Sequence, residues 1–256
     1  MKTIFIPNLS YFLLILIVLF FTSCQMTEEL TVTKNGSGTV SFKVDASFFM
    51  QMMGDKLNKE KTNTNYDTII HFKDVIKQNK DSILKLSQEK QKSLKKLENF
   101  SMRMQMNSDT EKMNFDMFTN FKDVKELNNM LNSFQEGYGL ASKSNKLLAS
   151  GKQTKKLSEP KTPSTKVNYL YSKKKFERNT EILNPEQLKK EVDSLGKLKT
   201  MFSSSTYKLI YTFPKRIKNA SIKEAYYSAN GKTITIEKNI IDYFSNPKIL
   251  DFSVEF

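Results

Sequence analysis

The sequence has few of the residues that catalytic and metal sites use most often. Its 256 residues include one cysteine, one histidine and no tryptophan. A lone cysteine excludes a disulfide within the chain, and a lone histidine, His71, excludes a zinc site with two histidine ligands. A Ser-His-Asp or Cys-His catalytic site would also have to use His71. Because no acid-base pair stands out among the carboxylates either, we expect a protein that is not an enzyme and holds no cofactor or metal.

Arginine is scarce too, although the chain is strongly basic. Lysine and arginine together number 41 against 27 acidic residues, which gives a formal net charge of +14. Only Arg103, Arg178 and Arg216 are arginines. Arginine makes the bidentate contacts that recognise phosphates and bases, whereas lysine is a hydrated point charge. The composition therefore argues against nucleic acid as a partner.

The first 23 residues have the features of a targeting segment. Lys2 supplies a positive start, residues 11–21 are an unbroken apolar run of eleven, and two small residues precede Cys24. The run is shorter than the about 20 apolar residues that cross a bilayer comfortably. An uncleaved anchor helix with an incidental cysteine is the alternative to a cleaved signal.

The same segment resembles a bacterial lipoprotein signal peptide, with residues 21–24, Phe-Thr-Ser-Cys, as its lipobox. The resemblance implies that Cys24 is diacylated, for example with palmitate, and becomes the mature N-terminus. Phe21 stands where such boxes usually have leucine. Gln25 after the cysteine implies the outer membrane, periplasmic or surface-facing, and Glu28–Glu29 resembles an acidic surface-export signal.

Three regions follow from this reading. They are a signal peptide at 1–23, a lipidated N-terminus and short tether at 24–29, and a single α+β domain at 30–256. Within the domain, residues 141–166 are rich in polar residues and lysine, which predicts a flexible basic loop. We expect its lysines, with those that follow it, to attract an anionic envelope surface, although they could instead serve only solubility. These lysines are Lys143, Lys146, Lys152, Lys155, Lys156, Lys173, Lys174 and Lys175.

Polarity patterns predict an antiparallel or mixed β-sheet built from hairpins, with helices packed mainly on one face. Strands are predicted at 30–33, 39–45, 100–106, 113–117, 167–176, 207–213, around Asn230–Gly231, and at 250–256, which we expect to close the sheet. Helices are predicted at 47–53, 84–97, 124–134 and 185–201. Residues 68–76 fit either a strand or the start of a helix.

Two stretches of the chain resemble known lipoproteins. Residues 27–32 (TEELTV), followed by Gly36-Ser37-Gly38 and by residues 41–45 (SFKVD), look like the opening of uncharacterised Bacteroidota-type cell-envelope lipoproteins. Residues 211–214 (YTFP) and 230–233 (NGKT) resemble, more weakly, the LppM-type lipoprotein domain, whose α+β fold is similar to a lipid-binding one. Neither resemblance supplies a catalytic motif, so no functional residue beyond Cys24 carries over.

Methionine is the residue type that is unusually frequent in this sequence. Met102, Met104 and Met106 fall on one face of a predicted strand, and Met113 and Met117 can return opposite them. Converging thioethers favour Cu(I), but flexible methionine side chains also fill cores or line adaptable apolar pockets. We favour the core or the pocket. His71, flanked by apolar residues, is expected to be a packed or surface residue.

Two functions from different classes therefore stay open. The first is an interaction or structural module of the cell envelope, with a protein partner that the sequence does not identify. The second is a carrier of a lipid-like ligand in an apolar pocket. A filled core would favour the first, and a cavity lined by the methionine and phenylalanine side chains would favour the second. Three short motifs, at 67–69, 81–83 and 193–195, also resemble O-glycosylation sites of Bacteroidota exported proteins.

Overall fold

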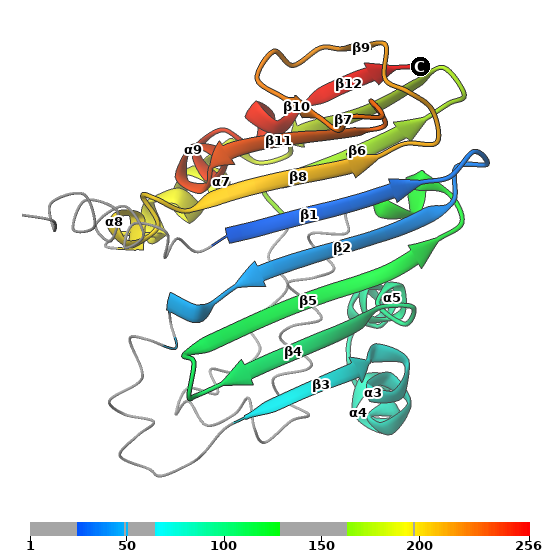
Figure 1. Cartoon of the computed structure of the whole chain (residues 1–256). Helices are drawn as coiled ribbons and strands as arrows, with labels where there is room; N and C mark the ends of the chain where they lie inside the picture. The colour runs from blue at the N-terminus through cyan, green and yellow to red at the C-terminus, as the bar shows by residue number, and fades with distance from the viewer. Residues whose placement is uncertain (1–24, 49, 51–64, 129–162, 197) are drawn as a thin grey trace, which may run out of the picture.

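The computed structural model describes residues 25–48, 50, 65–128, 163–196 and 198–256, and these form an α+β fold with two sheets (Figure 1). The large sheet contains β1 (Gln25–Val32), β2 (Gly38–Asp45), β3 (Tyr66–His71), β4 (Ser101–Asn107), β5 (Lys112–Phe121), β8 (Thr206–Thr212), β10 (Tyr226–Tyr227) and β11 (Thr233–Asn239). The small sheet contains β6 (Thr165–Tyr171), β7 (Lys175–Ile182), β9 (Asn219–Ala220) and β12 (Phe252–Glu255). The predicted fold class is confirmed.

The large sheet is mixed, with strand order β10-β11-β8-β1-β2-β5-β4-β3. Hairpins join β1 to β2 and β4 to β5, as the alternating patterns predict. The first of these turns on Gly36, whose φ of 85° suits glycine. One pairing is parallel: Gln25 of β1 lies opposite Thr206 of β8, and Thr31 lies opposite Thr212. The N-terminal strand is therefore central to the sheet.

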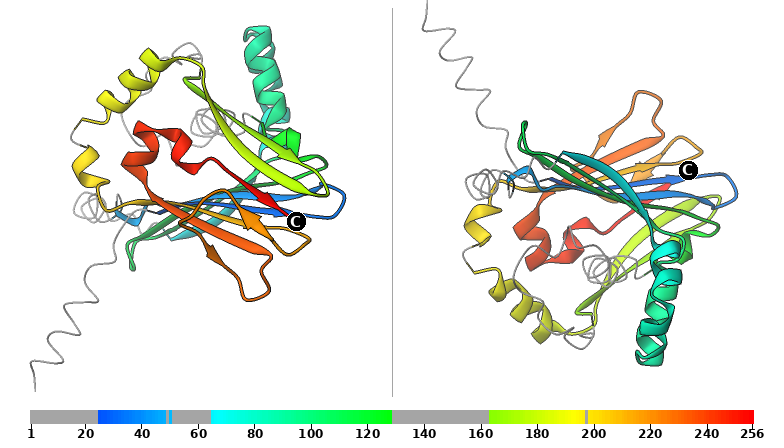
Figure 2. Two further views of the ribbon diagram at one scale, coloured as in Figure 1. Left: turned by 90° about the horizontal axis from the view of Figure 1, so that it is seen from above. Right: turned by 90° about the horizontal axis from the view of Figure 1, so that it is seen from below.

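The helices are short. They are α3 (Phe72–Gln78), α4 (Lys80–Leu84), α5 (Gln88–Lys96), α7 (Pro185–Ser194), α8 (Leu198–Met201) and α9 (Ile240–Ser245), with 3₁₀ turns η1 (Val124–Leu127) and η2 (Pro247–Leu250). Figure 2 shows the small sheet, α7, α9 and the run from α3 to α5 on one side of the large sheet. Within the described ranges, none of the helices has the length and apolar character needed to cross a membrane.

Much of the core lies between the two sheets, because the central strands of the large sheet each have one apolar and one polar face. In β1, Leu30 and Val32 are buried, whereas Thr31 between them is exposed. From the small sheet, Phe176 of β7 is fully buried and packs against Tyr211 at a ring distance of 5.7 Å and against Phe213 at 5.0 Å. Aromatic contacts of this kind join the two sheets.

Several expected boundaries differ in the structure. The expected tether, residues 24–29, is instead part of the sheet from residue 25 onward, because β1 begins at Gln25. The single strand expected at 167–176 is two strands, β6 and β7, separated by a tight turn at Ser172. The helix expected at 185–201 is divided into α7 and α8 near Gly196, whose φ is 45°. Of residues 250–256, only Phe252–Glu255 form a strand, β12, which pairs in the small sheet and not in the large one.

Other expectations are partly outside the described residues. The helix expected at 124–134 is described only through the 3₁₀ turn η1, and most of the helix expected at 47–53 is also outside the described ranges. The ambiguous stretch 68–76 contains both predicted states, because β3 ends at His71 and α3 begins at Phe72.

Candidate functional site

The predicted lipidation site, Cys24, lies outside the described residues, but the described fold begins directly after it. Gln25 already pairs with Thr206 of β8, and Met26 pairs with Val44 of β2. A lipid on Cys24 would therefore be attached directly before the first residue of an inner strand of the large sheet. This position fits a cleavage before Cys24, which would remove only residues that precede the sheet.

A buried carboxylate, Glu28, lies three residues into β1. It is 1% exposed and faces the space between the two sheets. Tyr169 of β6 donates a hydrogen bond to Oε1 at 2.8 Å, and Tyr207 of β8 donates one to Oε2 at 2.8 Å. Tyr211 of β8 donates a third, also to Oε1. One carboxylate from the large sheet is thus held by phenols from both sheets.

Arg178 of β7 supplies the positive charge next to this carboxylate. Its side chain is completely buried, with Nη2 at 4.0 Å from Glu28 Oε2 and Nη1 at 3.6 Å from Asp251 Oδ1. Nη1 also donates to the Leu250 carbonyl at 3.2 Å and, at 3.4 Å, to the Thr180 hydroxyl. Within the described residues, Nε and Nη2 of Arg178 have no hydrogen-bond partner. We call Glu28, Arg178, Tyr169, Tyr207 and Tyr211 the buried polar cluster.

The electrostatics of the buried polar cluster keep its phenols protonated. Burial, followed by the charge of Glu28, raises the pKa of Tyr207 well above its ordinary value, and the same two causes raise the pKa of Tyr169 and of Tyr211. Burial alone would lower the pKa of Arg178, but negative charge around it, that of Glu28 included, outweighs burial, so the pKa lies above its ordinary value. The phenols therefore act as hydrogen-bond donors, and the guanidinium stays charged.

This arrangement suits a structural clamp between the two sheets more than a reaction centre. Glu28, Tyr207, Tyr211 and Arg178 are each at most 1% exposed, so no surface is left for a substrate to contact. A buried charge is tolerated only when it is paired and hydrogen-bonded. The cluster thus fixes the register of β1 against β8 and against the small sheet.

Sequence reasoning missed this cluster because it treated Glu28 and Glu29 as one acidic pair. The alternation of buried and exposed side chains along β1 could have revealed the cluster. Glu28 shares a face with the buried Leu30 and Val32, whereas Glu29 falls on the opposite face and pairs there with Lys43 at 2.7 Å. The same alternation places Arg178 on the face of Phe176.

The methionine face is located in the core. The strand register sets Met102 opposite Met117, Met104 opposite Phe115, and Met106 opposite Met113. Met102, Met104 and Met117 are each at most 2% exposed and belong to the hydrophobic core. The expected common face is therefore confirmed, and its burial among apolar side chains favours the packing interpretation. In the described residues, no group of three or more His, Cys, Asp or Glu side chains could hold a metal ion.

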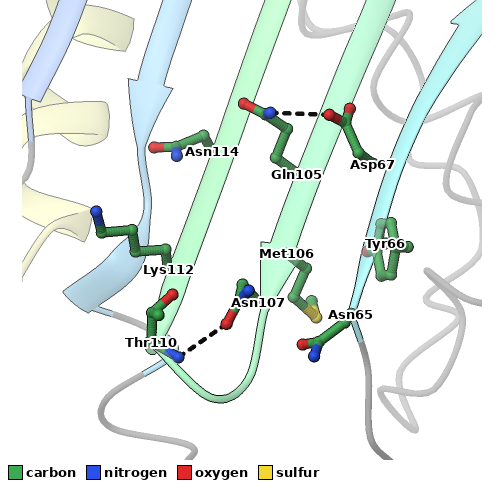
Figure 3. Close-up of a pocket in the computed structure, with 9 residues that line it drawn as sticks. All are labelled: Asn65, Tyr66, Asp67, Gln105, Met106, Asn107, Thr110, Lys112 and Asn114. Atoms are coloured by element: carbon green, nitrogen blue, oxygen red, sulfur yellow. Dashed lines mark hydrogen bonds between the residues drawn. The ribbon is translucent and has the colours of Figure 1, made fainter.

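One open pocket lies at the β4–β5 turn and the start of β3 (Figure 3). It has a volume of about 430 Å³, and its lining is mostly polar: Asn65, Tyr66, Asp67, Gln105, Met106, Asn107, Thr110, Lys112 and Asn114. Asp67 accepts hydrogen bonds from Arg103 at 2.8 Å and from Gln105 at 3.0 Å, and these contacts lower its pKa to about 2. Such a lining does not suit a lipid-like ligand.

The other residues singled out from the sequence are at the surface. His71 is exposed and lies 2.8 Å from the Ser101 hydroxyl, so it is a surface histidine. The hydroxyl-bearing residues of the three modification motifs, Thr68, Ser82 and Ser194, are exposed, but the Ser194 hydroxyl already donates to the Glu191 carbonyl at 2.6 Å.

The basic residues expected to meet an anionic surface divide into two groups. Lys143, Lys146, Lys152, Lys155 and Lys156 lie outside the described residues. Lys173 and Lys174 are exposed in the turn between β6 and β7, and Lys175 forms an ion pair with Glu177. This turn is at the end of the sheets opposite Gln25, because Tyr171 contacts the β1–β2 turn at Gly36.

Comparison with known proteins adds little. No family model matches the chain, and no curated protein matches it. Among solved structures, the folded domain of the Mycobacterium tuberculosis LppM protein is similar with a TM-score of 0.37 and 6% sequence identity, over 91% of this chain and 88% of that one. The Bacteroidota-type resemblance is not supported by these comparisons.

Proposed function

We propose that the protein is a lipoprotein of the bacterial cell envelope, anchored through a lipidated Cys24, and that its two-sheet fold serves as an interaction module. The observation that carries this proposal is the start of β1 at Gln25, directly after the sole cysteine and its signal-like segment. A cleavage before Cys24 would leave the whole described fold attached to the lipid. Gln25 after the cysteine favours the outer membrane as the destination.

Two features support an interaction module over an enzyme or a carrier. The titratable cluster between the sheets is closed to substrates. The methionine positions that could have lined an apolar pocket are packed in the core instead, and the pocket at the β4–β5 turn is polar. Among the described residues, these positions supply core packing and a polar surface for contacts, and they do not line an apolar pocket.

Substitution of Cys24 tests the anchoring. In cells that express the full-length protein, Cys24→Ala should prevent acylation and leave the protein out of the washed membrane fraction. Ser23→Ala is the matched control, because it keeps a small residue before the cysteine and should change neither property. A Cys24→Ala protein that stays membrane-bound to the same extent as the wild type would overturn the proposal.

A further inference from the structure

Four separate segments meet at the end of the sheets opposite Gln25. The β1–β2 turn contacts the small sheet there, because a Cβ on Gly36 would be 3.3 Å from the Tyr171 ring. The next turn of the small sheet is held to the chain after β8 by a hydrogen bond from Lys215 Nζ to the Lys173 carbonyl at 2.9 Å. That chain in turn pairs with the β10–β11 turn, because Ile217 N donates to the Gly231 carbonyl at 2.8 Å.

All the charged side chains of these four segments are basic. Residues 33–37, 172–174, 213–218 and 228–232 contain seven basic residues and no acidic one. We call this set the basic tip: Lys34, Lys173, Lys174, Lys215, Arg216, Lys218 and Lys232. Each of the seven is exposed, and none is in an ion pair among the described residues. The end of β12 lies beside the tip, because Lys218 N donates to the backbone carbonyl of Glu255 at 2.8 Å and Phe256 N donates to that of Lys174 at 2.9 Å.

Backbone hydrogen bonds join two segments of the tip, and aromatic side chains lie at its border. These bonds include the one from Phe213 N to the Lys232 carbonyl at 2.9 Å. β10 precedes the last turn of the tip, and its two tyrosines, Tyr226 and Tyr227, are 74% and 50% exposed. Exposed aromatic rings beside these basic side chains give a ligand a face on which its rings can stack, next to cations that contact its anionic groups.

The tip also points away from the lipid anchor. β1 runs from Gln25 to Val32, directly before the first segment of the tip, and seven steps of about 3.3 Å give roughly 23 Å between its ends. Figure 1 shows β1 and β8 directed to the same end of the molecule. This separation exceeds the Debye length of about 8 Å at physiological ionic strength. With Cys24 as the anchor, the basic tip thus lies at the far end of β1 from the lipid, and we infer that it faces away from the anchoring bilayer.

We propose that the basic tip binds an anionic polysaccharide, that is, a sugar polymer with carboxylate or phosphate groups, that lies away from the anchoring membrane. Exposed lysines outside ion pairs contact spaced anionic groups as point charges, and Tyr226 and Tyr227 offer faces on which sugar rings pack. The outward direction rests on the proposed anchoring through Cys24, whereas the binding does not. The expectation that Lys173, Lys174 and Lys175 attract an anionic envelope surface stays a prediction, and the proposal names a polysaccharide as that surface.

Binding of the full-length protein in neutral detergent to immobilised alginate, a polyuronate, tests the proposal. Wild type should bind alginate but not neutral dextran of the same length, and the binding should weaken as the Debye length shrinks from about 10 Å at 0.1 M salt to about 3 Å at 1 M. K173Q/K215Q/R216Q should bind at least tenfold more weakly. K73Q/K77Q/K80Q removes three exposed charges from α3 and α4, at the β3 edge, and should stay within twofold of wild type.

Melting curves of both triple variants establish that each is folded. The proposal is overturned by a wild type that binds alginate no better than dextran. It is also overturned by equal losses in the two triple variants, because the attraction would then reflect net charge alone. After detergent removal, weaker binding of K173Q/K215Q/R216Q than of K73Q/K77Q/K80Q to phosphatidylglycerol vesicles, with equal binding of the two to alginate, would assign the tip to a membrane instead. The Cys24→Ala fractionation is independent of all these outcomes.

Discussion

Glu28 and Glu29 are neighbours in the chain but have different environments. Glu29 lies on the outer face of β1 in an ion pair with Lys43, where its side chain is 38% exposed. Glu28 is enclosed among three phenols and Arg178. Removal of one partner from a buried charge pair leaves the other charge without compensation, which is far more costly than the loss of a surface pair.

We therefore expect Glu28→Gln to lower the free energy of unfolding by about 3 kcal/mol. Glu29→Gln should lower it by less than about 1 kcal/mol. The double variant Glu28→Gln/Arg178→Met should lower the free energy of unfolding by less than the sum of the two single variants. In the double variant, neither Glu28 nor Arg178 remains as a buried charge without its partner. Urea denaturation followed by circular dichroism measures all three values. Equal effects of Glu28→Gln and Glu29→Gln would show that the buried polar cluster does not act as a clamp.

Asp67 provides a pH-dependent prediction on the outer face. Hydrogen bonds from Arg103 and Gln105 lower its pKa from 3.8 to about 2 in the folded protein. A lowered folded-state pKa means that this pair stabilises the fold fully above pH 3.8, and that the contribution is lost as the pH falls toward about 2. Both partners are nearly half exposed, so the effect is small.

Carboxyl chemical shifts measured by NMR across an acid titration test this value. The wild-type Asp67 should titrate near pH 2, and Arg103→Gln should return its pKa toward 3.8. An Asp67 carboxyl that titrates at the same pH in both proteins would contradict the assigned hydrogen bonds.

At the scale of elements, hairpins and helix caps were the most predictable features. Asn35-Gly36 between alternating runs predicted the β1–β2 hairpin, and Asn184 with Pro185 predicted the start of α7, where the Asn184 side chain accepts from Gln187 N at 2.9 Å. The β6–β7 turn was missed because it contains neither glycine nor proline. Its Ser172 hydroxyl accepts a hydrogen bond from Lys175 N at 3.0 Å, and lysines provide the rest of the turn.

The pairing of β4 with β5 gives a test of the methionine face. Met104 is 2% exposed opposite Phe115, so Met104→Asp should destabilise the fold by several kcal/mol through burial of an unpaired charge. Met104→Leu keeps the apolar volume and should cost less than about 1.5 kcal/mol. Chemical denaturation measures both. Tight, stoichiometric Cu(I) binding that is lost in Met104→Leu without a loss of stability would reverse the assignment to a metal site.

At the scale of the whole molecule, the pairing of strands was far less predictable than the strands themselves. The parallel pairing of β1 with β8 joins residues about 180 positions apart, and the buried polar cluster draws on four strands from two sheets. Local patterns give the face of each strand but not its neighbour. The basic tip as a whole could not be predicted for the same reason, since its seven cations come from four segments that only the topology brings together.

The central claim is that lipidation occurs at Cys24, the residue directly before β1. Mass spectrometry of the N-terminal peptide of protein extracted from bacterial membranes tests it most directly. The account predicts a mature chain that begins at Cys24, with the mass of that peptide increased by a diacylglyceryl group. An unmodified Cys24, or a mature N-terminus at any other residue, would contradict it.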